Sequence, residues 1–552
     1  MLSGGEIINN HLLIDSDGCF VKNNKYVELQ LTSGIREQPD QSIAYSSSHN
    51  FRYFQLHYDL NSNHISFTSD RFASIQVFYY LTDDILLLST SFDYLIQMID
   101  DGARAMDKTA ASELVDYGYI LYGKTLIKGV TRFPYACTML VTPTNHAINR
   151  YWDFTINESI DIPVDAELLK SQLSQKLFSA IEESIPPNAD ILIPLSGGMD
   201  SRLLLAVALE IVESSRITTF TFGQANTQDL EIAQQISKSL ELRHIIHNVS
   251  SEKSLRLSEK DWNQSYLENI DLHNGSIDAT PFAASIDVYR DLRLHGNYLL
   301  NGHMGDPLFG SHLSADMLIQ IKTVPNPLEK VLEQNKNNPI VNILSEHKIG
   351  KPPAILQEAL AKYDTFAGYS MHWDYAIRQQ DYIKFGQISK FTNIFNVITP
   401  FLEPRLLDFA CNQIPLRQKL NETLYRQANI NTYPNLFKDF AMTNMGGMRV
   451  GSKSWERQFS RIKQKVNRVT RSSIFNVPQK LNYWNYQLVS KYQKEYRHFL
   501  LSNCSELNDN NIINRDMFEM LNRDIHKQLE LSSVLGRLST LNLSIKKYHI
   551  SV

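Results

Sequence analysis

The stretch ILIPLSGGMDSRLLL, residues 191–205, places a Ser-Gly-Gly turn between two apolar segments. A short buried strand followed by a helix explains both segments, and the turn then lies at the carboxyl end of the strand. Gly197 and Gly198 let the backbone approach an anion closely, and the helix presents free N–H groups to it. Asp200 suits a Mg²⁺ that bridges phosphate oxygens. The stretch therefore predicts a pyrophosphate-binding loop, and the simpler alternative is a glycine turn with Asp200 as an N-terminal charge.

Two other phosphate-binding motifs do not fit this loop. It lacks the lysine of the G-x-x-x-x-G-K-[ST] motif. It also lacks the G-x-G-x-x-G spacing, so a dinucleotide cofactor is not indicated.

The sequence around the loop alternates strand-like and helical segments. The strand-like runs are ADILIPL (189–195), ITTFTFG (217–223) and NYLLNG (297–302). This alternation predicts an α/β domain with a parallel sheet, which we place at residues 160–445. Residues 1–155 instead carry short alternating apolar runs, which predict an α+β domain built on antiparallel sheet. Residues 446–552 are expected to form a helical C-terminal extension.

The composition is typical of a cytoplasmic protein with more than one domain. Its 552 residues exceed one ordinary core, and its net charge of −5 gives no basic excess for nucleic-acid binding. The four cysteines are widely spaced, which favours a reducing compartment over a disulfide framework. No apolar run approaches the roughly 18 residues of a membrane span, and the first residues lack a signal-peptide pattern.

SGGMDS, residues 196–201, resembles the SGGxDS loop of the N-type ATP pyrophosphatases, and further segments resemble asparagine synthetase in the same order. These segments are TSDRFASIQVFYY (68–80), QDLEIAQQISKSLELRHIIH (228–247), LLNGHMGDPLFG (299–310) and ITPFLEPRLLDFACNQIP (398–415). The resemblance covers most of residues 45–440. It implies a glutamine-amidotransferase-like (Ntn-type) antiparallel domain followed by an adenine nucleotide alpha hydrolase-like (HUP) domain.

The resemblance also implies the site residues. The predicted ATP-binding residues are Leu195, Ser196, Gly197, Gly198, Asp200, Ser201, Gly223 and Gly302. Asp200 and Asp306 would hold Mg²⁺. Arg426 takes the place of the family's arginine. Lys438 lies nearest to the position of its catalytic lysine, and the alternative for Lys438 is a solvated surface lysine.

Several residues depart from the family pattern. Position 2 is Leu2 where the family has a nucleophilic cysteine, so we expect no glutamine hydrolysis and a structural or docking role for the first domain. His303 replaces an acid, and Pro307 and Glu422 also differ, which puts aspartate in doubt as the substrate. His303 is either a general base for the attacking amine or a structural loop histidine.

A basic segment, KSWERQFSRIKQKVNRVTR, spans residues 453–471. Its apolar residues share one helical face, which predicts an amphipathic helix. The helix either packs with a solvated basic face or contacts an anionic partner such as membrane headgroups, a nucleotide-sugar, a lipid-linked glycan or an acidic peptide.

These features together predict an ATP-dependent amide ligase. A substrate carboxylate on a small molecule, glycan or peptide would form an acyl-adenylate with release of pyrophosphate, and ammonia or an amine would then displace AMP. Three alternatives stay open: a peptide or lactam cyclase similar to the lasso-peptide and β-lactam synthetases, a uronic-acid amidating enzyme of surface polysaccharide synthesis, and a non-catalytic scaffold. The acceptor, the nitrogen donor and the oligomeric state are left open.

Overall fold

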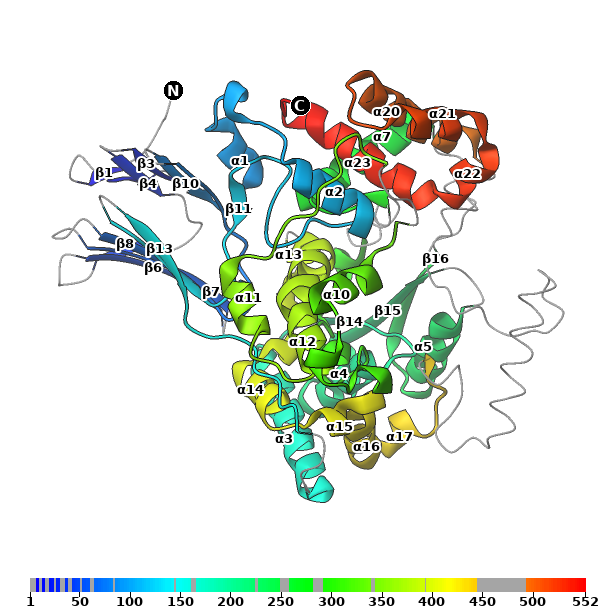
Figure 1. The fold of residues 1–552 in the computed structure, drawn as a ribbon. Helices are drawn as coiled ribbons and strands as arrows, with labels where there is room; N and C mark the ends of the chain where they lie inside the picture. Colours follow the sequence, from blue (N-terminus) through cyan, green and yellow to red (C-terminus); the bar gives the residue numbers. More distant parts are fainter. Residues whose placement is uncertain are drawn as a thin grey trace.

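Figure 1 shows the fold of the protein in a computed structural model. Within residues 1–52 the structure describes only the backbone strands. It describes side chains for residues 53–443 and 493–552, except 58–63, 83–84, 143–144, 160–164, 224–226, 248–257, 281–290, 339–342, 387, 389–390 and 393. The predicted basic helix at 453–471 lies outside the described residues.

The first part of the chain forms two sheets that are antiparallel apart from one parallel pair, β2 with β4. The first sheet has the order β1 (Glu6–Ile8), β2 (Leu12–Ile14), β4 (Tyr26–Leu29), β3 (Cys19–Asn23), β10 (Ile85–Ser89), β9 (Phe78–Leu81) and β11 (Val130–Arg132). The second has the order β13 (His146–Arg150), β12 (Cys137–Val141), β8 (His64–Ser69), β7 (Arg52–Asp59), β6 (Ser42–His49) and β5 (Ile35–Glu37). Apolar side chains of both sheets, among them Phe54, Phe67, Leu88 and Met139, form a buried cluster. The predicted antiparallel architecture is confirmed.

A parallel sheet forms the middle of the chain, as the alternating pattern predicts. Its order is β16 (Arg243–Asn248), β15 (Ile217–Gly223), β14 (Ile191–Pro194), β17 (Tyr298–Leu300) and β18 (Asn396–Ile398). The connecting helices include α3 (Ala166–Ser184), α4 (Met199–Ile211), α5 (Gln228–Ser239) and α7 (Glu259–His273). The strand order reverses direction at β14, between β15 and β17. Because ligands bind beyond the carboxyl ends of the strands at such a reversal, the end of β14 is the expected site.

Helices fill most of the remaining described chain. They include α1 (Phe92–Gln97), α2 (Lys108–Tyr117), α9 (Gly305–Leu308), α10 (Pro327–Asn335), α11 (Ala354–Leu360), α12 (Phe366–Trp373), the π-helix η7 (Asp374–Ile388), α13 (Ser389–Thr392), α14 (Pro404–Asn412), α15 (Leu416–Lys419), α16 (Thr423–Thr432), α17 (Pro434–Phe437), α20 (Lys494–Asp509), α21 (Arg515–Arg523), α22 (Ile525–Glu530) and α23 (Ser532–Lys547). No helix within the described ranges is both long and apolar enough to cross a membrane.

The C-terminal helices are confirmed, and they pack back onto the start of the chain. Helix α23 contacts α2 and α7, and Figure 1 shows it beside both. Arg537 on α23 donates a hydrogen bond to the Val115 carbonyl at 2.8 Å, and the backbone N–H of Met106 donates to the Ser551 carbonyl at 2.8 Å. The three domain ranges stay a prediction, because these contacts join the extension to the first range.

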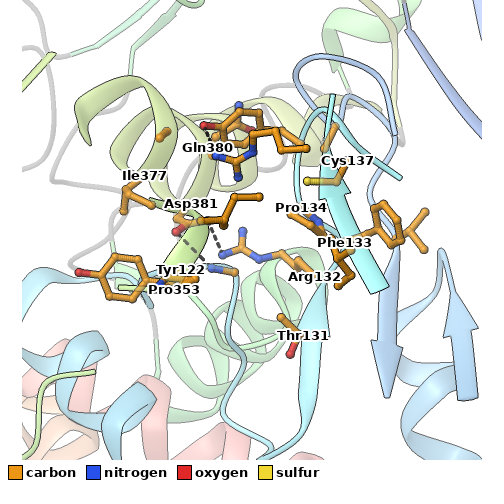
Figure 2. Close-up of a pocket in the computed structure, with 18 of the residues that line it drawn as sticks. Tyr122, Thr131, Arg132, Phe133, Pro134, Cys137, Pro353, Ile377, Gln380 and Asp381 are labelled. Carbon is orange, nitrogen blue, oxygen red and sulfur yellow. Dashed lines mark hydrogen bonds and ion pairs between the residues drawn. The ribbon is translucent and has the colours of Figure 1, made fainter. Parts of the chain in front are cut away.

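A cavity of about 260 Å³ lies where the antiparallel sheets meet η7 (Figure 2). Its lining is mostly apolar, and a buried ion pair joins Arg132 to Asp381 at 2.9 Å. The Arg132 guanidinium also lies 4.3 Å from the centre of the Phe385 ring. Burial raises the pKa of Asp381, and the charge of Arg132 opposes that rise.

Replacing Arg132 by methionine is expected to destabilise the protein by about 3–5 kcal/mol, because Asp381 then stays buried without its main cation. The loss of unfolding free energy, measured by urea denaturation, should be largest at neutral pH. Since the raised pKa favours a protonated Asp381 in the folded state, the loss should shrink as the pH falls toward that pKa. The control is Lys108→Met in the exposed pair with Glu346, for which we expect about 0–1 kcal/mol. Equal losses of stability in the two variants would contradict the conclusion that Arg132 stabilises the buried Asp381.

Candidate active site

The predicted pyrophosphate loop lies between β14 and α4. The backbone N–H of Leu195 donates to the Phe220 carbonyl at 2.9 Å, and the Thr221 hydroxyl donates to the Leu195 carbonyl at 2.6 Å. These bonds fix the start of the loop beside the end of β15, where Gly223 is the last residue. Gly198 precedes α4, and no side chain caps this helix. The first N–H groups of α4 and the positive end of its dipole are therefore suited to an anion.

Two serines brace the loop from within. The backbone N–H of Ser196 donates to the Ser201 hydroxyl at 3.1 Å, and the N–H of Gly198 donates to the Ser196 hydroxyl at 3.1 Å. The two hydroxyls lie 3.0 Å apart. A Cβ on Gly197 would meet the side chains of Thr443 and Asp229, with Asp229 Oδ1 at 2.9 Å, so a larger residue here would displace them.

Two distant segments hold the loop from outside. Asp229 Oδ1 accepts hydrogen bonds from the backbone N–H of Gly197 at 2.8 Å and from the Thr443 hydroxyl at 2.6 Å. The buried guanidinium of Arg202 donates to the Gly197 carbonyl at 3.1 Å. It also donates to the carbonyls of Leu436 and Ala441. The backbone N–H of Thr443 donates to the Gly197 carbonyl at 3.0 Å. The chain after α16 therefore returns to the loop.

The structure brings Asp200 and Asp306 together. Asp200 is in the first turn of α4, and Asp306 is in the first turn of α9, which follows β17. The backbone N–H of Asp306 donates to Asp200 Oδ2 at 2.9 Å, and the Tyr425 hydroxyl donates to Asp200 Oδ1 at 2.7 Å. Gly302 packs against Asp200, since a Cβ on this glycine would lie 3.0 Å from the Cβ of Asp200.

The electrostatics of this carboxylate pair suit a divalent cation. Burial, and then the negative charge of Asp306, raise the pKa of Asp200. Asp306 keeps part of its surface accessible to solvent, and desolvation by the surrounding protein raises its pKa. Glu422 adds further negative charge near Asp200. No group of three or more His, Cys, Asp or Glu side chains suited to a metal occurs in the described part of the chain. The residues fit Mg²⁺, which is commonly held by one or two carboxylates plus phosphates and water.

The three residues predicted to be catalytic lie in different surroundings. His303 is buried, its ring centre is 5.6 Å from that of Phe72, and burial lowers its pKa to about 3. Arg426 donates to the Asn421 carbonyl at 2.9 Å. Lys438 is exposed at the end of α17, in the segment that returns to the loop. The roles of His303, Arg426 and Lys438 stay predictions.

Sequence reasoning missed the contacts of Arg202 and Tyr425. Arg202 directly follows the SGGMDS motif, so its position was a usable signal. Tyr425 precedes Arg426, but nothing in the local sequence indicates that its hydroxyl reaches Asp200.

The parallel sheet, the loop at its reversal point and the paired carboxylates define an α/β nucleotide-binding domain of the pyrophosphate-loop type. Residues 173–429 match the asparagine synthase family, and this domain belongs to that family. The match supports an ATP-dependent carbon–nitrogen ligase.

Solved structures with partial similarity include two NAD synthetases. One is the NH3-dependent NAD synthetase from Campylobacter jejuni subsp. jejuni NCTC 11168 in complex with the nitrate ion, at 15% identity and a TM-score of 0.18, covering 27% of this chain and 61% of that one. The other is the glutamine-dependent NAD+ synthetase from Acinetobacter baumannii in complex with adenosine diphosphate, at 18% identity and a TM-score of 0.18, covering 36% of this chain and 41% of that one. The chain thus spans less than two thirds of either structure. No curated protein matches the chain.

Proposed function

We propose that the protein is an AMP- and pyrophosphate-forming amide ligase that works in the cytoplasm. The observation that carries the proposal is the contact between Asp200 and Asp306 beside the pyrophosphate loop, at the carboxyl ends of β14 and β17. The asparagine synthase match of residues 173–429 supports the same reaction class.

The geometry supports a two-step reaction. The loop and the N-terminus of α4 bind the phosphates of ATP, and adenine lies near Leu195 and Gly223. Asp200 and Asp306 would hold Mg²⁺, which supplies positive charge to the phosphates. A substrate carboxylate oxygen attacks the α-phosphorus, the bond to the β-phosphate breaks, and pyrophosphate leaves. A nitrogen nucleophile then attacks the acyl carbon, AMP leaves with the bonding electron pair, and the nitrogen loses a proton.

Positioning and charge stabilisation are the protein's main contributions to these steps. Arg426 and Lys438 are the proposed cations for the negative charge that develops on the transferred groups. His303 is the proposed proton acceptor, although its lowered pKa makes it a weak base.

The nitrogen is proposed to arrive as ammonia or as an amine, rather than from glutamine hydrolysis on this chain. Cys137, Cys411 and Cys504 are buried, and burial raises the pKa of each thiol, to about 11 for Cys411 and about 12 for Cys504. Since the thiolate is the nucleophilic form, none of these three described cysteines is suited to attack an amide. In the alternative of a peptide or lactam cyclase, an amine of the same substrate molecule would be the nitrogen nucleophile.

The direct test is pyrophosphate release from ATP with Mg²⁺ and candidate carboxylates. We expect release with ammonium and less than a tenth of that rate with glutamine, because no described thiol is activated. Release that requires glutamine would contradict the proposed nitrogen source. No release with any acceptor, together with no ATP binding, would favour the scaffold alternative.

A further inference from the structure

A second cavity, of about 540 Å³, is lined in part by His312 and Ser314, which follow α9, the helix that carries Asp306. Tyr375 follows Asp374, a lining residue at the start of η7. Its hydroxyl donates to the Pro307 carbonyl at 2.9 Å, so this contact joins η7 to α9. Asp374 Oδ2 lies within hydrogen-bond distance of His312 Nδ1, at 2.9 Å. His312 also lowers the pKa of Asp306, against the rise that burial causes. These contacts connect two residues that line the cavity, His312 and Asp374, to the helix that carries one of the proposed metal ligands.

Among the described residues that line this cavity, Arg378 is the one that carries a permanent positive charge, and its contacts are long. Arg378 approaches Asp374 Oδ1 and both ring nitrogens of His312, each at 3.4 Å. These distances exceed the usual length of about 2.9 Å for an N–H···O bond, so the contacts are weak. The Arg378 side chain keeps 29% of its surface exposed. Because a guanidinium has five N–H donors, this residue can still take a carboxylate in a two-point contact.

A buried hydroxyl on the same cavity lacks a partner. Tyr119 lines the cavity with only 2% of its surface exposed, and its hydroxyl has no hydrogen-bond partner among the described residues. Its ring stacks on that of Tyr382, with the centres 4.9 Å apart. Buried hydroxyls are normally paired, so a ligand group is the natural partner for this one. Tyr119 follows α2, which means that the amidotransferase-like part of the chain contributes to the cavity.

The remaining lining indicates the chemistry of the ligand. Neutral polar and aromatic side chains dominate it: Gln334, Asn335, Asn337, Trp373 and Tyr382. Amide side chains both donate and accept, which suits the hydroxyls of a sugar, and aromatic faces suit its C–H edges. The lining has a single guanidinium, that of Arg378, so it suits a ligand with one carboxylate better than a free amino acid such as aspartate, which carries an ammonium and two carboxylates.

We propose that this cavity binds the acceptor of the reaction and that the acceptor is a carboxylated sugar of the hexuronate type. The carboxylate lies toward Arg378, the Tyr119 hydroxyl bonds a sugar oxygen, and the ring lies against the aromatic side chains. This inference rests on the proposed ligase function and names its substrate class. The hexuronate could be a free sugar or part of a nucleotide-sugar, because both present the same ring and carboxylate.

The test measures pyrophosphate release by the full chain with ATP, Mg²⁺, ammonium and one of four probes: glucuronate, UDP-glucuronate, aspartate or a short peptide. We expect pyrophosphate release with glucuronate or UDP-glucuronate. The probe that gives the faster release shows whether the acceptor is a free sugar or a nucleotide-sugar. Arg378→Gln should raise the KM for that uronate about tenfold or more, the loss typical of a charge-assisted bond, and leave the KM for ATP unchanged. The control is Arg216→Gln, which removes an arginine of similar exposure (27%) from its pair with Asp190, at the amino ends of β14 and β15. This control should change neither KM.

Tyr119→Phe separates binding from a structural role. Removing a hydroxyl that has no protein partner should leave the thermal midpoint unchanged or higher, whereas the KM for the uronate should rise severalfold. Release with aspartate or peptide and with neither uronate would overturn the sugar assignment and leave the ligase standing. Uronate-dependent release that neither variant weakens would overturn the cavity assignment. Absence of release with every probe overturns the inference as well, and loss of ATP binding in that case marks failure of the proposed function itself.

Discussion

Asp200→Asn is expected to abolish pyrophosphate release while the protein stays folded. The substitution removes the carboxylate that accepts a hydrogen bond from the backbone of Asp306 and lies close enough to the Asp306 charge for its pKa to rise. A bound metal supplies several kcal/mol of charge stabilisation in the transition state, so turnover should fall by about 10³-fold or more. The measurement is pyrophosphate release under saturating ATP, with circular dichroism as the check on the fold.

The matched control for this prediction is Asp190→Asn. Asp190 directly precedes β14, at the opposite end of the same strand, and it pairs with Arg216 on the surface. Its substitution should leave turnover unchanged. Mg²⁺ with an ATP analogue should raise the thermal midpoint of the wild type and of Asp190→Asn, but not that of Asp200→Asn. Turnover near the wild-type level in Asp200→Asn would remove this residue from the metal site.

The pyrophosphate loop could be predicted from the sequence because its determinants are contiguous. The strand at 191–194, the glycines and the helix from Met199 follow one another directly, and the local pattern fixes all three. Asp306 could be predicted for a similar reason, since it follows a short apolar strand and a Gly-rich turn. The parallel order of the strands then places both carboxylates at one edge of the sheet.

The contacts around the loop could not be predicted in this way. Asp229 and Thr443 meet at Gly197 from far apart in the chain, and the periodicity of a segment says nothing about such partners. Likewise, local pattern does not show that Tyr119 lines a cavity whose other lining residues lie between His312 and Tyr382. The two edge strands, β16 and β18, were also missed, because the pattern of a short segment does not show which strand it pairs with. Tertiary packing decides these features, and the patterns of a single sequence show local structure but not contacts between distant segments.

Gly305→Ala is expected to lower turnover at least about 100-fold, because misplacing a catalytic group by about 1 Å can cost this much. Gly305 begins α9 and packs directly on the carboxyl group of Asp200. A Cβ at this position would lie 2.6 Å from Asp200 Oδ1 and closer still to Oδ2 and Cγ. Asp200 or the backbone of Asp306 must therefore move, and the two carboxylates can no longer hold one ion in the same geometry. Pyrophosphate release at several Mg²⁺ concentrations measures the effect, and the concentration at half-maximal rate should rise.

Gly102→Ala is the control that separates this effect from a general loss of stability. Gly102 is exposed, and no atom lies within 4 Å of the Cβ that the substitution adds. Its substitution should leave turnover and the Mg²⁺ requirement unchanged. Overpacking at Gly305 should also destabilise the fold by about 1–3 kcal/mol, so activity is compared at a temperature at which both variants are folded. If Gly305→Ala loses stability but keeps the wild-type turnover and Mg²⁺ requirement, the close approach of α9 to Asp200 serves packing alone, and the carboxylate pair does not form the metal site.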